Sequence, residues 1–314
     1  MIILVDGLNF FMRHYAANPS LTQNGESAGG VVGFLGGLAK LCRQFSPKQV
    51  HVVWEGGGSL RRRAIYKDYK KGKKPQRFNR YYEDDIPDSN ENRLSQVAFL
   101  TKCLRNLPVH QHYVKDCEAD DVIGYFARYS FPQHNTLIVS SDKDFYQLVD
   151  DRINIWSPGQ KRLIDESAVL EKMLVKPSNV AVTRAFVGDS SDNINGIKGA
   201  GFKTLAKRFP FLTTHERVTL DSIFTECERM KEVSKVRIYH NILENKNLAK
   251  RNLQLMCLDI SNLAATQIQQ INGSLEINKI AYDKLSFLRS LRKFGLINFD
   301  PSALFLQMNL LRNQ

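Results

Sequence analysis

Short apolar runs that end in an acidic residue recur along the first half of the chain. Three of these runs lead into an acid: residues 2–5 into Asp6, 50–54 into Glu55 and 136–141 into Asp142. Short runs rich in β-branched residues, separated by longer helical stretches, are typical of parallel strands in an α/β protein. The pattern therefore predicts a mostly parallel central sheet with flanking helices.

The apolar positions between and after these runs predict the remaining elements. Helices are expected over residues 30–45, 89–106, 119–129 and 145–149. A weaker strand is expected over 109–114, and the runs 153–156 and 161–164 predict a β-hairpin. After about residue 165 the strand signal nearly vanishes. We therefore expect an α/β core over 1–165 and a mostly helical part over 166–314.

Acidic residues gather at the ends of the predicted strands. In sheets of this kind the functional site lies beyond the carboxyl ends of the strands, so these acids should meet at one edge. Helix capping and helix-dipole compensation explain one or two of them, but not the whole set. The candidate metal ligands are Asp6, Glu55, Glu118, Asp120, Asp121, Asp142, Asp144, Asp189 and Asp192.

Nine converging carboxylates repel one another unless cations neutralise them. Oxygen ligands without histidine or cysteine favour Mg²⁺ over zinc, with Mn²⁺ as a substitute. Two ions about 4 Å apart can activate a water and stabilise the leaving oxygen of a phosphodiester. The seven histidines are scattered along the chain, and the five cysteines show no CxxC spacing, so a thiolate zinc site or a disulfide framework is not indicated.

The net charge of +12 favours an acidic partner, nucleic acid above all. Residues 61–80 hold ten basic residues and one acid, with aromatic residues interleaved. This combination is typical of single-strand binding, although a solvated helix face is the alternative. Glycines and a proline in the stretch indicate an arch or lid over the acids at about residues 56–93. The expected nucleic-acid contacts are Arg61, Lys67, Tyr69, Lys71, Lys73 and Lys74.

The stretch GIKGAGFKT, residues 196–204, resembles a phosphate loop but lacks the lysine of a Walker A motif. It fits better as the turn of a helix-hairpin-helix over about residues 188–209. There, backbone N–H groups and a helix N-terminus can approach a phosphate. The residues expected to bind the duplex are Lys198, Gly199, Gly201, Lys203 and Thr204.

The chain resembles the structure-specific 5′-nuclease family through five motifs and the order in which they occur. These motifs are LVDGLN, YKDYKKGK, EADD, SSDKDFYQL and GDSSDNINGIKGAG. That family includes flap endonucleases, the 5′-nuclease domain of bacterial DNA polymerase I and phage 5′-exonucleases. Within this family, the chain is most similar to the T-even-type phage ribonuclease H enzymes, because of its SSDKDFYQL motif, its WSP tripeptide and its helical tail. The motifs cover residues 1 to about 209. The resemblance implies a PIN-like 5′-nuclease fold with a helical arch.

The resemblance also implies individual roles. The first metal would take Asp6, Glu118, Asp120 and Asp142, the second would take Asp144, Asp189 and Asp192, and Asp121 would serve either. Lys70 and Arg62 stand where the family keeps catalytic basic residues that steer the phosphate. Tyr69 would stack on an unpaired base or pack within the arch. Glu55 stands where the family usually has Asp, which puts that ligand in question.

The resemblance implies Mg²⁺-dependent hydrolysis near the 5′ end of RNA or DNA on a duplex, including removal of RNA primers during phage DNA replication. Its partners would be DNA and RNA–DNA duplexes with 5′ ends or flaps. Residues 302–314 are apolar enough to dock on a clamp or single-strand-binding protein, but such stretches are more often a last core helix. The alternatives are a catalytically weakened DNA-structure-binding protein, for which Glu55 is the only hint, and a PIN-type ribonuclease, which is usually shorter.

The chain carries no targeting or membrane signal. The N-terminal residues lack a basic segment, and no apolar run approaches the roughly 18 residues of a membrane span. We therefore expect a soluble, unprocessed cytoplasmic monomer, located in the host cytoplasm if it is phage-encoded.

Overall fold

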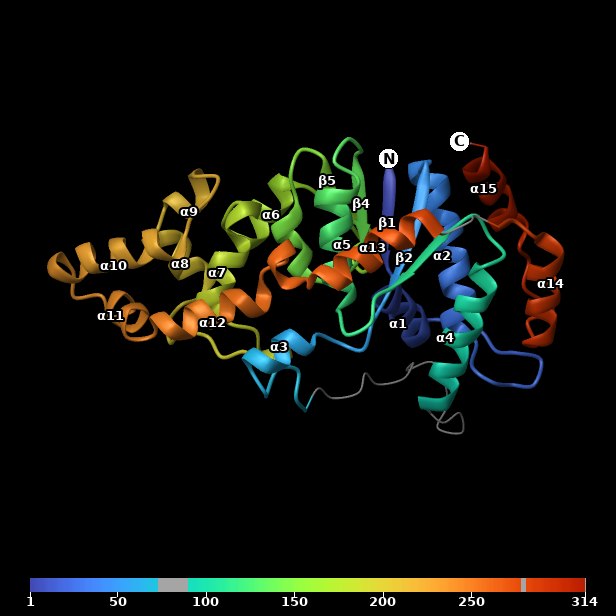
Figure 1. The fold of residues 1–314 in the computed structure, drawn as a ribbon, viewed down its shortest axis with the longest axis horizontal. Helices are drawn as coiled ribbons and strands as arrows, with labels where there is room; N and C mark the ends of the chain where they lie inside the picture. The colour runs from blue at the N-terminus through green and yellow to red at the C-terminus, as the bar shows by residue number, and fades with distance from the viewer. Residues whose placement is uncertain (73–89, 278–280, 314) are drawn as a thin grey trace.

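The computed structural model describes residues 1–72, 90–277 and 281–313. A six-stranded sheet, ordered β3-β2-β1-β4-β5-β6, forms its centre (Figure 1). The strands are β1 Ile2–Asp6, β2 Gln49–Trp54, β3 His110–Tyr113, β4 Thr136–Val139, β5 Ile153–Ser157 and β6 Arg162–Ile164. All neighbours pair in parallel except β5 and β6, which form the antiparallel hairpin. The predicted mostly parallel sheet is therefore confirmed.

The register of the sheet brings the strand ends together. β1 lies between β2 and β4, with Asp6 opposite Val53 and Val5 opposite Val139. Every residue of β1 is buried, as expected for a strand covered on both faces. The residues that follow β2 and β4 consequently lie at the same edge as Asp6.

Two hydrophobic clusters cover the two faces of the sheet. Because side chains alternate along a strand, Ile3 and Val5 join one cluster and Ile2 and Leu4 join the other. The first cluster includes helices α1 Gly7–Ala17, α2 Gly29–Phe45 and α4 Asn90–Leu104. The second includes α5 Ala119–Tyr125, the π-helical turn η1 Phe126–Ser130 and α13 Ala265–Ile277. The sheet is thus a middle layer between helices.

All described elements after residue 165 are helices, as the predicted mostly helical part requires. The elements are α6 Glu166–Met173, η3 Pro177–Asn179, α7 Val180–Val187, η4 Ser190–Asp192, α8 Phe202–Arg208, α9 Phe211–Thr214, α10 Leu220–Val233, α11 Arg237–Glu244, α12 Lys246–Met256, η5 Ile260–Asn262, α13, α14 Lys284–Lys293 and α15 Ser302–Arg312. Most of them extend from one side of the sheet, whereas α14 and α15 lie at the opposite end (Figure 1).

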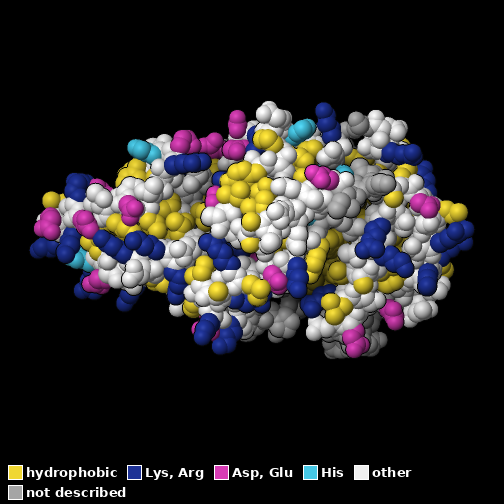
Figure 2. All heavy atoms as spheres, in the orientation of Figure 1, with side chains coloured by type: hydrophobic (Ala, Val, Ile, Leu, Met, Phe, Trp, Pro, Cys, Tyr) yellow, Lys and Arg dark blue, Asp and Glu magenta, His cyan; other side chains and the backbone are white. Residues whose placement is uncertain are grey.

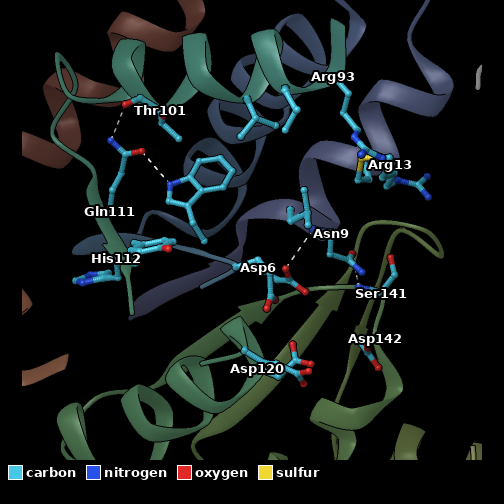
Figure 3. A pocket seen from close by; sticks show the side chains of 18 of the residues that line it. Asp6, Asn9, Arg13, Arg93, Thr101, Gln111, His112, Asp120, Ser141 and Asp142 are labelled. Carbon is cyan, nitrogen blue, oxygen red and sulfur yellow. Dashed lines mark hydrogen bonds between the residues drawn. The ribbon is translucent and has the colours of Figure 1, made fainter. Parts of the chain in front are cut away.

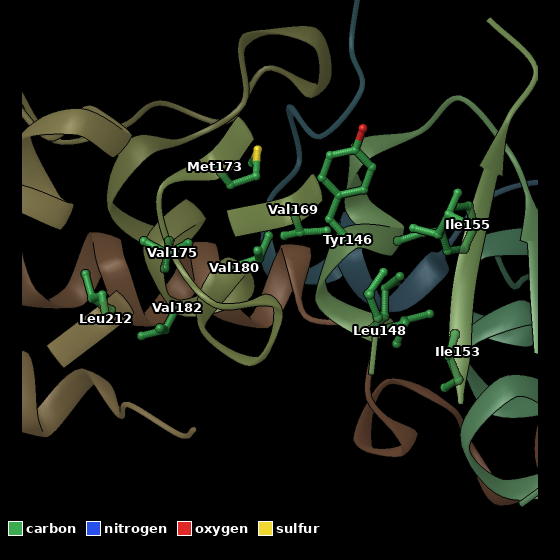
Figure 4. Close-up of a cluster of buried hydrophobic side chains, with 14 of the residues drawn as sticks. Tyr146, Leu148, Ile153, Ile155, Val169, Met173, Val175, Val180, Val182 and Leu212 are labelled. Atoms are coloured by element: carbon green, nitrogen blue, oxygen red, sulfur yellow. The ribbon is translucent and has the colours of Figure 1, made fainter. Parts of the chain in front are cut away.

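Buried side chains connect the sheet with the helical part. Figure 4 shows Tyr146 and Ile155 on the sheet side and Val169, Val180 and Leu212 on the helical side of one hydrophobic cluster. The cluster crosses residue 165 without a break, and the division into domains at that position stays a prediction. At the other end, α15 packs against α2 through a buried face that contains Leu304, Met308 and Leu311.

Some helices differ from the sequence-based expectation. The segment 119–129 is an α-helix followed by a π-helical turn, and the segment expected at 145–149 is the 3₁₀ helix η2 Lys143–Leu148, which Asp142 caps. Helix α1 was not predicted, although Asp6 caps it by accepting the N–H of Asn9.

No described helix has both the length and the apolar character that crossing a membrane requires.

Candidate functional site

Asp6 stands at the centre of the carboxyl edge of the sheet. Its Oδ1 accepts the Asn9 N–H at 3.2 Å and its Oδ2 accepts the Ser140 hydroxyl at 3.0 Å. Ser140 follows β4, so these bonds join the ends of two neighbouring strands. Burial raises the pKa of Asp6 to about 7, with contributions from the nearby charges of Asp142 and Glu55.

Asp120 and Asp142 face the same space as Asp6. Figure 3 shows all three in a cleft of about 1620 Å³. The walls of this cleft include Leu8 of α1 and Val97 of α4. Burial, followed by repulsion from Asp142 and Asp6, raises the pKa of Asp120 well above its usual range. Among the described residues, no ion pair joins any of these three acids to a basic side chain. We call Asp6, Asp120 and Asp142 the open group.

Arg62, by contrast, neutralises two acids of helix α5 and its N-cap. This side chain belongs to α3 Leu60–Ile65 and is 3% exposed. It forms a bidentate ion pair with Asp121, in which Nη2 donates to Oδ1 at 2.7 Å and Nη1 donates to Oδ2. Its Nη1 also lies 3.3 Å from Glu118 Oε2, and its Nε donates to the Leu255 carbonyl at 2.7 Å. The guanidinium is therefore fully engaged with the protein.

Lys70 and Tyr69 complete the surroundings of Glu118. The Lys70 ammonium lies 3.0 Å from Glu118 and 3.9 Å from Asp192, and the Tyr69 hydroxyl donates to Glu118 at 3.0 Å. Although burial favours the neutral acid, Lys70 and Arg62 lower the pKa of Glu118. Tyr69 is buried, whereas Lys70 remains 31% exposed at the cleft. The choice between base stacking and packing for Tyr69 stays a prediction.

Arg184 is a functional candidate that the sequence analysis missed. It lies in helix α7, and its Nη2 is 2.7 Å from Asp144 Oδ1 and 2.6 Å from Asp189 Oδ2. Burial raises the pKa of Asp144 to about 7; Arg184 opposes this, while Asp142 and Asp189 add to it. A lone arginine four residues before GDSSDN carried no recognisable signal. We call Glu118, Asp121, Asp144, Asp189 and Asp192 the paired group.

Glu55 is held by backbone groups. Its Oε1 accepts the Gly58 N–H at 3.0 Å and its Oε2 accepts the Ala119 N–H at 3.3 Å. Burial and the charge of Glu118 raise its pKa. Glu55 thus connects the loop after β2 to the start of α5, and the longer Glu side chain spans this gap.

The donor set matches a hard divalent cation. Every candidate ligand offers carboxylate oxygen, and the raised pKa values of Asp6, Asp120 and Asp144 show that negative charge is costly here. A divalent cation would relieve this cost. Across the residues described, no three acidic, histidine or cysteine side chains are gathered closely enough to hold an ion as they are placed. The assignment of individual ligands therefore stays a prediction.

The glycine hairpin connects α7 to α8. Its geometry depends on Gly188 and Gly196, because a Cβ on either would lie 2.4 Å or less from backbone atoms of the other side. Gly199 has φ +85°, which favours glycine, whereas a Cβ on Gly201 would meet no atom within 4 Å. Gly201 caps α8, and Lys203 is exposed in its first turn. The expected duplex contacts therefore lie on an accessible surface.

The basic segment is described up to residue 72. Arg61, Lys67 and Lys71 are exposed, and Lys71 pairs with Asp68 at 3.1 Å. Lys73 and Lys74 lie outside the described residues. On the face shown in Figure 2, Lys and Arg side chains lie among acidic ones over the helical end of the molecule, and Lys198 and Lys203 of the glycine hairpin are exposed. Positive charge is therefore available on both sides of the carboxylates.

Three features define the 5′-nuclease class of hydrolases: a mostly parallel α/β sheet with acids at its carboxyl edge, a basic segment whose Lys70 contacts two of the acids, and a helical extension with a glycine hairpin. Residues 1–174 match the family described as 5′-3′ exonuclease, N-terminal resolvase-like domain. The chain belongs to this 5′-3′ exonuclease family.

Individual relatives agree with this assignment. The chain is 31% identical over 265 residues to the flap endonuclease Xni of Shewanella oneidensis, covering 82% of this chain and 88% of that protein. It is 29% identical over 309 residues to DNA polymerase I of Thermus aquaticus, covering 96% of this chain but 34% of the polymerase. The chain thus spans about a third of that polymerase and 24% of the polymerase I of Rhizobium leguminosarum.

The fold is also found among solved structures. The T5 5′-exonuclease with bound zinc superposes with a TM-score of 0.67 at 18% identity, over 88% of this chain and 99% of that one. This similarity extends the shared fold beyond residue 174 into the helical part.

Proposed function

We propose that this chain is a divalent-metal-dependent, structure-specific 5′-nuclease. It hydrolyses phosphodiesters near the 5′ end of DNA or RNA held on a duplex, by exonuclease, flap endonuclease and ribonuclease H action, and removes RNA primers during phage DNA replication. The observation that carries the proposal is that Asp6, Asp120 and Asp142, from three separate segments, line one cleft beside Lys70. Family membership supports the same activity.

The proposed cofactor is two Mg²⁺ ions, which Mn²⁺ can replace. The open group with Glu118 would hold the first ion, and Asp144, Asp189 and Asp192 would serve the second. When bound, the ions supply an activated water and stabilise charge on the leaving oxygen. We assign Asp121 to Arg62, because both of its oxygens face that guanidinium. Glu55 stays a proposed ligand, since a carboxylate oxygen that accepts one backbone N–H keeps a lone pair for an ion.

Lys70 is the proposed catalytic cation of the chain itself. Its ammonium, partly exposed at the cleft, can reach a phosphate and stabilise the negative charge that develops in the transition state. Arg62 is proposed as a positioning residue instead, because its burial and its bond to Leu255 keep it away from substrate. Together Arg62 and Tyr69 hold Glu118 in place beside Lys70.

The nucleic acid would be bound through its backbone. We propose that the basic segment at about residues 56–93 receives the single-stranded 5′ arm and that the glycine hairpin receives the duplex. Contacts to phosphates position a substrate without reading bases, so specificity is for structure. We further propose that the protein is a cytoplasmic monomer. Its protein partner would be a single-strand-binding protein or a sliding clamp.

Two other functions fit less well. A catalytically weakened DNA-structure-binding protein was suggested by Glu55 alone, and the backbone hydrogen bonds of Glu55 give that residue a structural purpose. A PIN-type ribonuclease lacks the glycine hairpin and the helical extension that this chain carries.

The test is a cleavage assay with 5′-flap DNA, nicked RNA–DNA hybrid and single-stranded DNA, each labelled at either end. Mg²⁺ and EDTA reactions are compared, beside Asp142→Asn. Short labelled 5′ products that require metal and a duplex junction are expected, with no cleavage but intact duplex binding by the variant. Near-normal turnover of Asp142→Asn would refute the metal assignment, and binding without cleavage by the unaltered protein would favour the weakened-site alternative.

A further inference from the structure

Two cations join the loop at residues 189–192 to the edge of the sheet. Lys70 lies between Glu118 and Asp192, and Arg184 lies between Asp144 and Asp189. In each case one basic side chain contacts one acid of the sheet edge and one acid of the loop. The side chains of Lys70 and Arg184 therefore hold the loop against the edge of the sheet.

Arg184 is the more deeply embedded of the two cations. Its side chain is 8% exposed, against 31% for Lys70, and the N–H groups of a single nitrogen, Nη2, face both carboxylates. Its buried Nε has no hydrogen-bond partner in the described structure. Burying a guanidinium with an unsatisfied Nε costs free energy, and an apolar side chain would fill the same space without that cost. The ion pairs with Asp144 and Asp189 are therefore the contribution of Arg184 at this position.

The charge of Asp189 is already balanced without an ion. Its Oδ2 contacts Arg184, while its Oδ1 accepts the N–H of Ser191 at 2.8 Å and the Ser191 hydroxyl at 2.6 Å. These hydrogen bonds lower the pKa of Asp189 despite its burial. The open group has no comparable basic partner among the described residues.

We infer that Arg184 is a built-in counter-cation that takes the place of the second ion when that ion is absent. It stabilises the ion-free arrangement of Asp144 and Asp189, and its positive charge opposes a divalent ion bound at the same two carboxylates. The open group consequently binds its ion first, and the second ion binds more weakly. This inference rests on the divalent-metal dependence proposed above.

The experiment compares Arg184→Met with Arg152→Met as a matched control. Arg152 is also an arginine with intramolecular bonds, but its guanidinium donates to the carbonyls of Ala127, Phe131 and His134. Its own carbonyl accepts the N–H of Thr136, the first residue of β4, at the edge of the sheet opposite the acids. Mn²⁺ binding to each protein is titrated by the electron paramagnetic resonance signal of free Mn²⁺. Thermal unfolding is recorded in EDTA and in saturating Mn²⁺.

The unaltered protein is expected to bind Mn²⁺ in two steps. Arg184→Met should tighten the weaker step by about tenfold or more, the scale on which a charge at this distance shifts an ionic equilibrium, and leave the tighter step unchanged. Its midpoint of unfolding should fall in EDTA and recover in Mn²⁺. Arg152→Met should lower the midpoint equally in both conditions. An unchanged or weakened second step in Arg184→Met would overturn the inference.

A second measurement covers the case in which Arg184→Met does not fold. In the unaltered protein, the arginine side-chain N–H resonances are followed during a Mg²⁺ titration, and Arg184→Lys identifies the Arg184 signals. These signals should shift in the second binding step and stay constant in the first. Constant signals throughout both steps would overturn the inference. Absence of any divalent binding would instead refute the proposed function, so the two failures are distinguishable.

Discussion

Asp120 and Asp121 are neighbours in the sequence with opposite surroundings. Asp121 receives Arg62 on both carboxylate oxygens, whereas Asp120 faces the cleft with other acids nearby. One residue of an α-helix turns by about 100°, so adjacent acids on α5 point into different environments. The open and paired groups therefore show two uses of an aspartate. Paired with a buried arginine it connects segments of the fold, and without a basic partner it repels the other acids of the cleft.

Neutralising Asp120 is expected to have the largest effect of the four changes. Asp120→Asn should reduce the cleavage rate by about four orders of magnitude, or about 5 kcal/mol, because an acid of the open group is lost. The midpoint of unfolding in EDTA should rise, since repulsion from Asp6 and Asp142 disappears. Single-turnover cleavage and calorimetry measure the two effects. A lower midpoint in EDTA would contradict the assignment of Asp120 to the open group.

Removing Arg62 tests the paired group. Arg62→Met leaves Asp121 and Glu118 buried without their guanidinium, so the free energy of unfolding should fall by about 3 kcal/mol or more. Denaturant titration gives the value. The double variant Arg62→Met with Asp121→Leu should recover part of the loss, because no unpaired charge remains at Asp121. A single variant as stable as the unaltered protein would show that the pair is dispensable.

Removing Lys70 tests the cation that contacts the paired group and also lines the cleft of the open group. Lys70→Ala should lower the turnover of bound substrate by about 10²-fold, or about 2.7 kcal/mol, if the ammonium stabilises developing charge. Lys70→Arg serves as the control that keeps the charge. Turnover at saturating substrate separates this role from binding, and an unchanged rate would reduce Lys70 to a surface contact.

Tyr69→Phe is the mildest change. It removes the hydroxyl that donates to Glu118 and keeps the ring, so the free energy of unfolding should fall by about 1.5 kcal/mol. Binding to single-stranded DNA should stay the same, because the buried ring packs within the protein. Weaker single-strand binding with unchanged stability would instead support base stacking by Tyr69.

The strands and their acids could be predicted because the carboxyl ends of parallel strands meet at one edge. The partners of those acids could not, because they arrive from distant segments: Arg62 reaches Glu118 across 56 residues and Leu255 across 193. The histidines show the same limit. Scattered in the sequence, His51, His110 and His112 stack in the structure because β2 and β3 place His51 opposite His110.

The root of the basic segment is tied to the glycine hairpin loop by two hydrogen bonds. The Lys70 N–H donates to the Asp192 carbonyl at 3.0 Å, and the Asn193 amide donates to the Asp68 carbonyl at 2.9 Å. The surface proposed for the single strand and the surface proposed for the duplex therefore begin at one shared joint. If both surfaces bind as proposed, this joint holds their starting points together, and the cut is expected at a constant distance from the junction of the substrate.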